Sequence, residues 1–144
     1  EVDLEKEAGE SPVIKYVNLV IQNAAKDGAS DIHIEPSDKK LTVRFRIDGE
    51  LYSMMEPPAS MSAAIASRLK IMGNLDISER RLPQDGRIRC IVGGRKLDLR
   101  LSTLPTQYGE KAVMRILDTR SINVKLEDLG FDENTMENWK NQIN

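Results

Sequence analysis

The chain has 144 residues, of which 40% are hydrophobic and 31% are charged, and its formal net charge is −2 at pH 7. This length and composition are typical of one soluble globular domain whose core is large enough to fold without disulfides. The slightly acidic balance argues against nucleic-acid binding by the chain as a whole, and the single cysteine, Cys90, excludes an internal disulfide. No apolar run approaches the roughly 18 residues that a membrane-spanning helix needs.

Apolar residues recur along the chain with a helical period in some segments and with a period of two in others. Ser11-Pro12 suits a helix start, because serine can cap and proline fits the first helical position. Asp48-Gly49 and Gly93-Gly94 are typical of tight turns between antiparallel strands. The expected elements are a charged, flexible lead-in over 1–10, helices over 12–27 and 60–72, strands over 31–35, 41–47, 50–55, 87–92, 96–103 and 110–117, a turn over 83–86, and a last helix from 132.

The short links between successive strands favour an antiparallel sheet of about six strands with helices packed on one face. The sequence therefore predicts an α+β fold. We expect the folded domain to span residues 11–131, and residues 132–144 to begin a helix or linker into a further domain, so that the chain is a piece of a longer protein.

Arginine gathers on the polar side of the predicted strands. Leu97, Leu99 and Leu101 alternate with polar residues, so Arg100 is expected on the solvent side of a sheet. The same periodicity predicts exposed strand positions for further arginines, namely Arg44, Arg46, Arg87, Arg89 and Arg115.

These arginines have two interpretations that composition and periodicity leave open. The first is a solvated face with cross-strand ion pairs, for example to Asp98. The second is an anion site, because guanidinium groups bind phosphate oxygens in pairs and stay charged at any working pH. Arginines that reach into a nucleotide pocket from outside can also stabilise the charge that develops in phosphoryl transfer.

Other chemistries are disfavoured by the sequence. His33 and Cys90 form no recognisable catalytic pair or zinc motif, so we expect His33 at the surface or a sheet edge and Cys90 as a small buried hydrophobe. The chain has no G-x-x-x-x-G-K-[ST] and no G-x-G-x-x-G motif that would hold a phosphate at a helix start. Nucleic-acid binding by stacking is not expected, because the arginine strands carry almost no exposed aromatic residues.

Five motifs occur in a fixed order along the chain: ASDIHIEP (29–36), RFRIDG (44–49), RLPQDGR (81–87), LRLSTLPTQYGEKAVMRILD (99–118) and LGFDENT (129–135). Together they closely resemble the domain that precedes the motor in the assembly ATPases of type II secretion and type IV pilus systems. The resemblance covers nearly the whole chain from about Ser11 onward.

This resemblance implies a PAS-like α+β fold, joined by a short linker to a RecA-like ATPase domain. It implies a cytoplasmic homo-hexamer that is held at the inner membrane by a platform protein. The ATP cycle of this hexamer would drive pilus or pseudopilus assembly and protein secretion. ATP and Mg would be held by the motor domain of the same or a neighbouring subunit. Arg100 and Arg115 match family positions that reach the nucleotide phosphates, with Arg81 and Arg87 as secondary contributors, while His33 and Glu35 would mark a structural signature near the domain interface.

The sequence departs from that family by lacking the Walker A and Walker B segments. We therefore expect no catalytic residue, no metal site and no ATP hydrolysis in this chain alone, and no cofactor bound to it alone. Two other functions stay open. A PAS-like sensor would need a ligand cavity, for example one left unfilled by Met54, Met61 and Met72, whereas a purely structural ring-building module would not need Arg100 or Arg115 for turnover.

Overall fold

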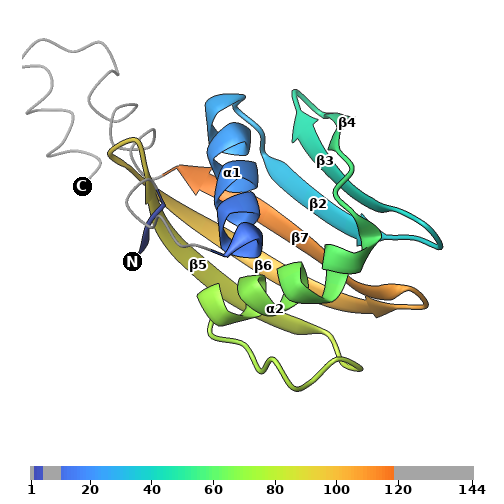
Figure 1. Ribbon diagram of the computed structural model, residues 1–144. Coiled ribbons are helices and arrows are strands. Elements are labelled where there is room, and N and C mark those ends of the chain that lie inside the picture. Colours follow the sequence, from blue (N-terminus) through green and yellow to red (C-terminus); the bar gives the residue numbers. More distant parts are fainter. Residues whose placement is uncertain (1, 5–10, 119–144) are drawn as a thin grey trace, which may run out of the picture.

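The computed structural model describes residues 2–4 and 11–118. Figure 1 shows two helices lying against the same face of one twisted sheet. In chain order the elements are β1 (Val2–Asp3), α1 (Pro12–Lys26), β2 (Asp31–Pro36), β3 (Leu41–Ile47), β4 (Glu50–Met55), the short 3-10 helix η1 (Ala59–Met61), α2 (Ser62–Met72), β5 (Gln84–Val92), β6 (Arg95–Thr106) and β7 (Gly109–Asp118).

The strands form one seven-stranded sheet in the order β1-β5-β6-β7-β2-β3-β4. Strands β2 to β7 pair antiparallel with their neighbours, and only the two-residue β1 pairs in parallel, with β5. Pairing of β2 with β7 joins the first hairpin of the chain to the last one. The expected α+β fold, with about six antiparallel strands and helices on one face, is confirmed, and it is compatible with a PAS-like arrangement.

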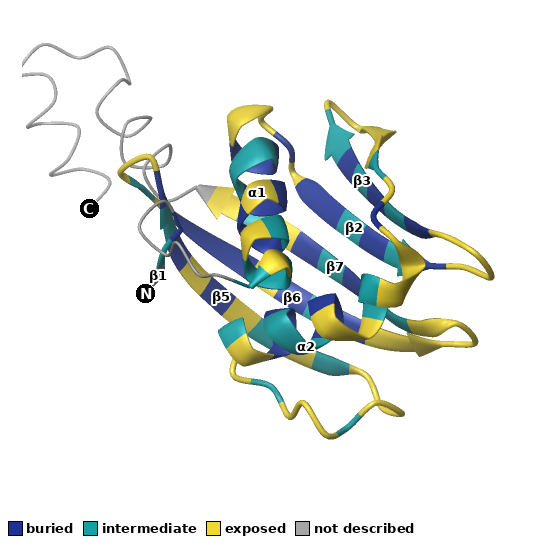
Figure 2. Ribbon diagram, in the orientation of Figure 1, coloured by how far each residue is buried: buried dark blue, intermediate teal, exposed yellow. Residues whose placement is uncertain are grey.

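The core lies between the helices and the sheet. Ser11 caps the start of helix α1, because its hydroxyl accepts a hydrogen bond from the Ile14 amide at 3.4 Å. Alternating bands of buried and exposed residues run along the strands in Figure 2, as a sheet with one covered face requires. The side chains at the centre of this core, each almost fully buried, are Val17, Val20, Ile21, Ala24, Ile32, Phe45, Ile65, Leu69, Leu99 and Met114.

The two predicted tight turns are confirmed. Asp48 and Gly49 both have positive φ (52° and 84°), and so do Gly93 and Gly94 (54° and 79°). Positive φ at both central residues matches the twist of the flanking antiparallel strands. These turns fix the register of the β3–β4 and β5–β6 hairpins, and hence which side chains share a face.

The predicted turn over 83–86 is wrong, because β5 already begins at Gln84. Gly86 lies within the strand, opposite Leu101. A Cβ atom there would stand 2.7 Å from the Gly73 carbonyl oxygen and 2.8 Å from Leu75 Cδ2. Glycine is required because the end of α2 packs directly on the strand, a reason that local sequence does not reveal.

The structure also adds β1, although we expected no element before Ser11. Residues 2 and 3 pair with Cys90 and Ile91, and Leu4 is 3% exposed. The helix expected from 132 and the domain boundary at 131 lie outside the described residues. Within the described part of the chain, no helix is long and apolar enough to span a membrane.

Candidate functional site

The side of the sheet opposite the helices carries the arginines. Arg87, Arg89, Arg100 and Arg115 are exposed, and Arg44 and Arg46 are partly buried. The predicted placement of these six side chains on the solvent side of strands is confirmed. This face of β5, β6 and β7 is the candidate site.

Three of the arginines form one row across three strands. Arg87 of β5 is directly opposite Arg100 of β6, and Arg100 is directly opposite Arg115 of β7. Residues directly opposite each other on one face have Cβ atoms about 5 Å apart, and like charges in that position repel. We call Arg87, Arg100 and Arg115 the arginine row. The row places three guanidinium groups within reach of one multivalent anion.

The outer two members of the row have carboxylate partners. Arg87 hydrogen bonds to Asp98 through Nε, at 3.3 Å from Oδ1, and through Nη2, and these bonds together with the attraction of the carboxylate raise the pKa of Arg87 above its usual value. Arg115 Nε lies 3.1 Å from Asp31 Oδ1, and Arg46 Nε lies 3.6 Å from Asp31 Oδ2. The ion-pair interpretation is therefore correct for these arginines.

Arg100, between them, differs. Across residues 2–4 and 11–118, no hydrogen bond or ion pair to Arg100 is found, and its side chain is exposed. The row thus holds three positive charges beside two carboxylates, of which Asp31 is also shared with Arg46. The central arginine is the one left available for an anion.

A hollow of about 640 Å³ lies beside two members of the row, within the size range of small-molecule sites. Arg87, Arg100 and Ser102 line it, and Ser102 donates a hydrogen bond to Asp85 Oδ1 at 2.7 Å. The first two residues after α2 line it as well. The remaining lining residues are Gly73, Asn74, Asp85, Gly86 and Leu101.

Arg81 is not part of the row. It is exposed in the segment between α2 and β5, residues 73–83, which we call the connector. No hydrogen bond or ion pair joins Arg81 to any other described residue. The structure thus brings together Arg87, Arg100 and Arg115 of the four predicted site arginines, and leaves Arg81 separate from them.

A second charged group lies on the same face near β2 and β3. Glu35 accepts a hydrogen bond from Arg44 at 2.9 Å and lies 3.8 Å from Lys111 Nζ. His33, two residues before Glu35 on β2, was expected at the surface or a sheet edge. It is partly exposed on this face, and it has strand neighbours on both sides, so the surface alternative holds and the edge alternative does not. Burial lowers the pKa of His33, and Lys111, Arg46 and Arg44 lower it to a smaller extent, against the attraction of Asp31, which raises it.

Cys90 is fully buried, as expected of a small core residue. In the described ranges, no three His, Cys, Asp or Glu side chains cluster in a way that could hold a metal ion. Sequence reasoning missed Asp31, which is 5% exposed and holds both Arg115 and Arg46. Only the strand register reveals it, because Asp31 and Arg115 are 84 positions apart.

Known proteins resemble this chain over almost its full length. A family model described as "Type II/IV secretion system protein" matches residues 6–144. The chain is 51% identical over 142 residues to the type IV pilus assembly ATPase PilB of Myxococcus xanthus, covering 98% of this chain and 25% of that protein. It is 53% identical over 133 residues to the type II secretion system protein E of Xanthomonas campestris, covering 92% of this chain and 24% of that protein.

A third relative is the type II secretion system ATPase E of Vibrio cholerae, which is 43% identical over 141 residues. The match covers 98% of this chain and 28% of that protein. The chain therefore spans about a quarter of the length of these curated relatives.

Proposed function

Because this chain belongs to the family of type II/IV secretion system proteins, we propose that it is the regulatory domain of a type II secretion or type IV pilus assembly ATPase. In this proposal, Arg100 and Arg115 contact the phosphates of ATP held by a motor domain, with Arg87 and Arg81 as secondary contributors. ATP turnover would then be coupled to pilus or pseudopilus assembly and to protein secretion. The observation that carries the proposal is Arg100, exposed and without a described partner between two other arginines.

Physical chemistry gives the arginine row a reason to bind phosphate. Three adjacent guanidinium groups repel one another in the empty site, and an anion seated between them removes that repulsion. The side chains of Arg115 and Arg87 are 70% and 51% exposed, so water screens their pairs with Asp31 and Asp98. The carboxylates themselves are only 7% and 12% exposed, so Asp31 and Asp98 hold Arg115 and Arg87 beside Arg100, and the exposed ends of these guanidinium groups remain available to a ligand.

In this proposal, the motor domain and not this chain supplies the hydrolytic machinery. This chain contains no G-x-x-x-x-G-K-[ST] loop to hold the triphosphate. ATP and Mg would be bound by the motor domain of the same or a neighbouring subunit in a homo-hexamer. The assembly would be cytoplasmic and would reach the inner membrane through a platform protein. The role of this domain is then to complete the site and to gate it through hinge closure against the motor.

The test compares ATP turnover in the full-length protein that carries this domain, as wild type, Arg100→Ala and Arg115→Ala. Arginines that stabilise transferring phosphoryl groups raise the reaction rate by roughly 10³–10⁵. We therefore expect Arg100→Ala to lower the rate of ATP turnover by at least about 10³-fold. The matched control is Arg89→Ala, an exposed arginine on the same face of β5 but outside the row. Ring formation is measured on the same samples.

Unchanged turnover by Arg100→Ala in intact rings would overturn the proposed role of the row. That result, together with lost ring assembly when the whole domain is deleted, would favour a purely structural module instead.

A nucleotide or small-ligand sensor is the second candidate, favoured by the hollow beside Arg87 and Arg100. A sensor would bind its ligand without a motor domain. Calorimetric titration of the 144-residue chain with ATP distinguishes the two functions, because gating predicts no measurable binding to the isolated chain. Binding that is lost in Arg100→Ala would favour the sensor.

A further inference from the structure

Two further hollows adjoin each other at the turn between β6 and β7. One, of about 300 Å³, is lined by Thr106 and Tyr108 of the turn together with Arg80, Glu110 and residues of η1 and the start of α2. We call it the Arg80 hollow. The other, of about 460 Å³, is lined by the same two turn residues together with residues of β2 and β3, and we call it the β2–β3 hollow. Neither hollow is lined by a member of the arginine row.

The turn shared by the two hollows is held in place by local contacts. The Thr106 hydroxyl accepts a hydrogen bond from the Tyr108 amide at 3.2 Å and donates one to the Gly109 carbonyl oxygen. A Cβ atom at Gly109 would stand 3.4 Å from Ser62 Oγ and 3.5 Å from Pro36 Cγ, so the turn lies between the start of α2 and the end of β2. Tyr108 is therefore presented on a braced turn, with 48% of its surface exposed.

An exposed tyrosine in this position is suited to protein recognition. Its hydroxyl has no hydrogen-bond partner among the described residues. Tyrosine and arginine are enriched at the centres of protein–protein interfaces, because a rigid ring supplies much contact area at little entropic cost and a guanidinium group binds carboxylates in pairs. Tyr108 and Arg80 line the same hollow, so both kinds of anchor occur together here.

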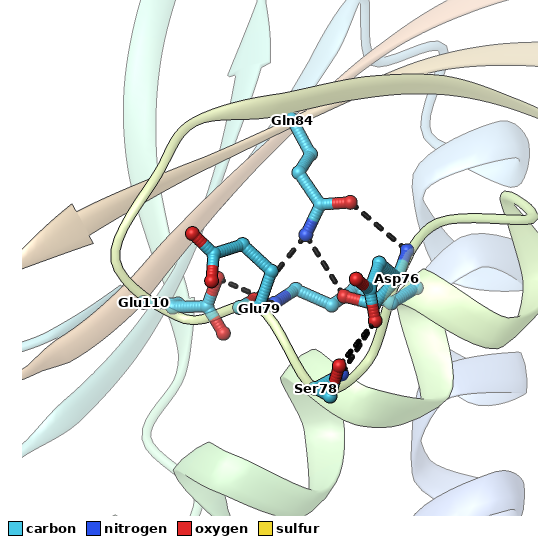
Figure 3. Close-up of polar contacts among 6 residues, drawn as sticks. Asp76, Ser78, Glu79, Gln84 and Glu110 are labelled. Atoms are coloured by element: carbon cyan, nitrogen blue, oxygen red, sulfur yellow. Dashed lines mark hydrogen bonds and ion pairs between the residues drawn. The ribbon is translucent and has the colours of Figure 1, made fainter.

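Arg80 follows directly after an anchored residue of the connector. Lys70 Nζ donates a hydrogen bond to the Glu79 carbonyl oxygen, and it lies 2.7 Å from Oε2 of Glu110, whose side chain is 9% exposed. Gln84 Nε2 donates to the same carbonyl oxygen at 3.3 Å. Figure 3 shows Glu79, Glu110 and Gln84 at this point. The backbone just before Arg80 is thus held both by the buried pair and by the start of β5.

The charges around the two hollows leave one positive charge without a partner. The carboxylates that line them, Glu110 and Glu35, both have cationic partners within the protein. Arg80, by contrast, is exposed and has no hydrogen bond or ion pair to any described residue. A carboxylate is therefore the group that complements this surface.

We propose that the two hollows and Tyr108 form a docking surface for an extended, acidic peptide segment of a partner protein. A carboxylate side chain of the segment lies in the Arg80 hollow and binds the Arg80 guanidinium group. The segment passes over Tyr108 and places a second side chain in the β2–β3 hollow. Alternate side chains of an extended chain point the same way, so one segment can occupy two adjoining hollows. This surface goes beyond the proposed function and does not depend on the arginine row.

The test begins with random short peptides displayed on phage and selected on the full-length protein that carries this domain. We expect the selected peptides to carry aspartate or glutamate close to an apolar residue. A selected peptide, labelled with fluorescein, is then titrated without nucleotide against wild type, Arg80→Ala and Tyr108→Ala. Each substitution should weaken binding by on the order of tenfold, because it removes a charge-assisted hydrogen bond or an aromatic anchor.

Arg81→Ala and Tyr52→Ala are the matched controls. Both residues are exposed and neither lines the two hollows, so both variants should bind the peptide as wild type does. Changing the acidic residue of the peptide to its amide should weaken binding to wild type as much as Arg80→Ala does. The same change should have no further effect on binding to Arg80→Ala, because the two groups act as one pair.

A cysteine placed in the hollow locates the peptide. Ser60 is exposed and lines the Arg80 hollow, whereas Ser53 is exposed on β4 and lines neither hollow. The peptide should slow alkylation of the introduced thiol by iodoacetamide in Ser60→Cys and leave it unchanged in Ser53→Cys. Mass spectrometry of the labelled protein follows both reactions.

Four results would overturn the inference. They are a selection that yields no peptide or only peptides without an acidic residue, equal affinity of wild type and Arg80→Ala, and an unprotected thiol in Ser60→Cys. The fourth is displacement of the peptide by free glutamate at concentrations near the Kd of the peptide, which would make the hollow a small-molecule site. None of these measurements uses ATP, so their outcome is independent of the role proposed for the arginine row.

Discussion

Positive charge serves two different purposes in this protein, as Lys70 and Arg100 illustrate. Lys70 is 1% exposed and has a carboxylate 2.7 Å away. Arg100 is exposed on the open face of the sheet and is bonded to no residue that the structure describes. A buried charge must be paired within the protein, whereas an exposed one is hydrated and can be passed to a ligand. Burial therefore separates the basic residue that holds the fold from those that can bind an anion.

The open face repeats this contrast on a smaller scale. Near β2 and β3, Glu35 binds both Arg44 and Lys111. In the arginine row, by comparison, the central member has no hydrogen-bond or ion-pair partner among the described residues, and the outer two pair with Asp98 and Asp31. The member of the row without a described partner thus lies on β6, beside the hollow.

The largest expected effect on stability comes from breaking the buried pair. Lys70→Met should lower the free energy of unfolding by about 3–5 kcal/mol, because Glu110 is left buried without a counterion. Lys70→Met combined with Glu110→Leu should recover most of that loss. Urea unfolding of the three proteins measures this directly. A double variant as unstable as the single one would show that charge pairing is not what Lys70 contributes.

Smaller effects are expected in the arginine row. Arg115→Ala should lower the free energy of unfolding by no more than about 1 kcal/mol. The pair of Arg115 with Asp31 is exposed on the arginine side, and Asp31 keeps Arg46 as a second partner. Arg100→Ala should cost nothing or stabilise the fold by about 0.2–1 kcal/mol, because it removes repulsion from both neighbours. Chemical unfolding at low and high salt measures the stability change caused by each substitution. High salt should make each change relative to wild type smaller, because it screens the charges. A loss above about 1 kcal/mol for Arg100→Ala would instead give that residue a structural role.

The smallest effect concerns pH and His33. Burial lowers the pKa of His33 in the folded protein, so the unfolded chain binds this proton more readily. The contribution of His33 to the free energy of unfolding is therefore fully present above the ordinary histidine pKa of about 6.5. It is lost as the pH falls from there toward the lower pKa that His33 has in the folded protein. Asp31, Lys111, Arg46 and Arg44 face His33 and set the size of the shift.

In His33→Gln, the free energy of unfolding should therefore change less than in wild type as the pH is lowered from 7 to below about 6.5. Thermal unfolding at a series of pH values tests this against wild type. An equally steep profile in His33→Gln would assign the pH dependence to the carboxylates.

Much of the fold could be predicted because its signals are local. The period of two in β3 and β6, the caps at Ser11 and Gly73, and the two hairpin dipeptides each specify a structure within a few residues. These features also place Arg100 on the open face, since strand side chains alternate strictly between faces. The family resemblance then singled out Arg100 and Arg115 among the exposed arginines, which stays a prediction, whereas the family itself is confirmed.

The parts that sequence did not predict depend on contacts between distant segments. Gly86 resembles a turn glycine, but its role is set by the approach of Gly73 in space. Asp31 became a counterion only through the pairing of β2 with β7, and Lys70 resembles an ordinary polar position of a helix until Glu110 and Glu79 are placed beside it. Strand order and loop packing fix these relations, and neither is encoded in a local pattern.

The most direct test of the central claim is the affinity of the full-length protein for ATP and for adenosine, measured in wild type and Arg100→Ala. Adenosine lacks the phosphates, so it reports every contact except the one assigned to the arginine row. We predict that Arg100→Ala weakens ATP binding by roughly ten- to a hundredfold, the size of a charge-assisted hydrogen bond, and leaves adenosine binding unchanged. Equal affinity of wild type and Arg100→Ala for ATP would contradict the account.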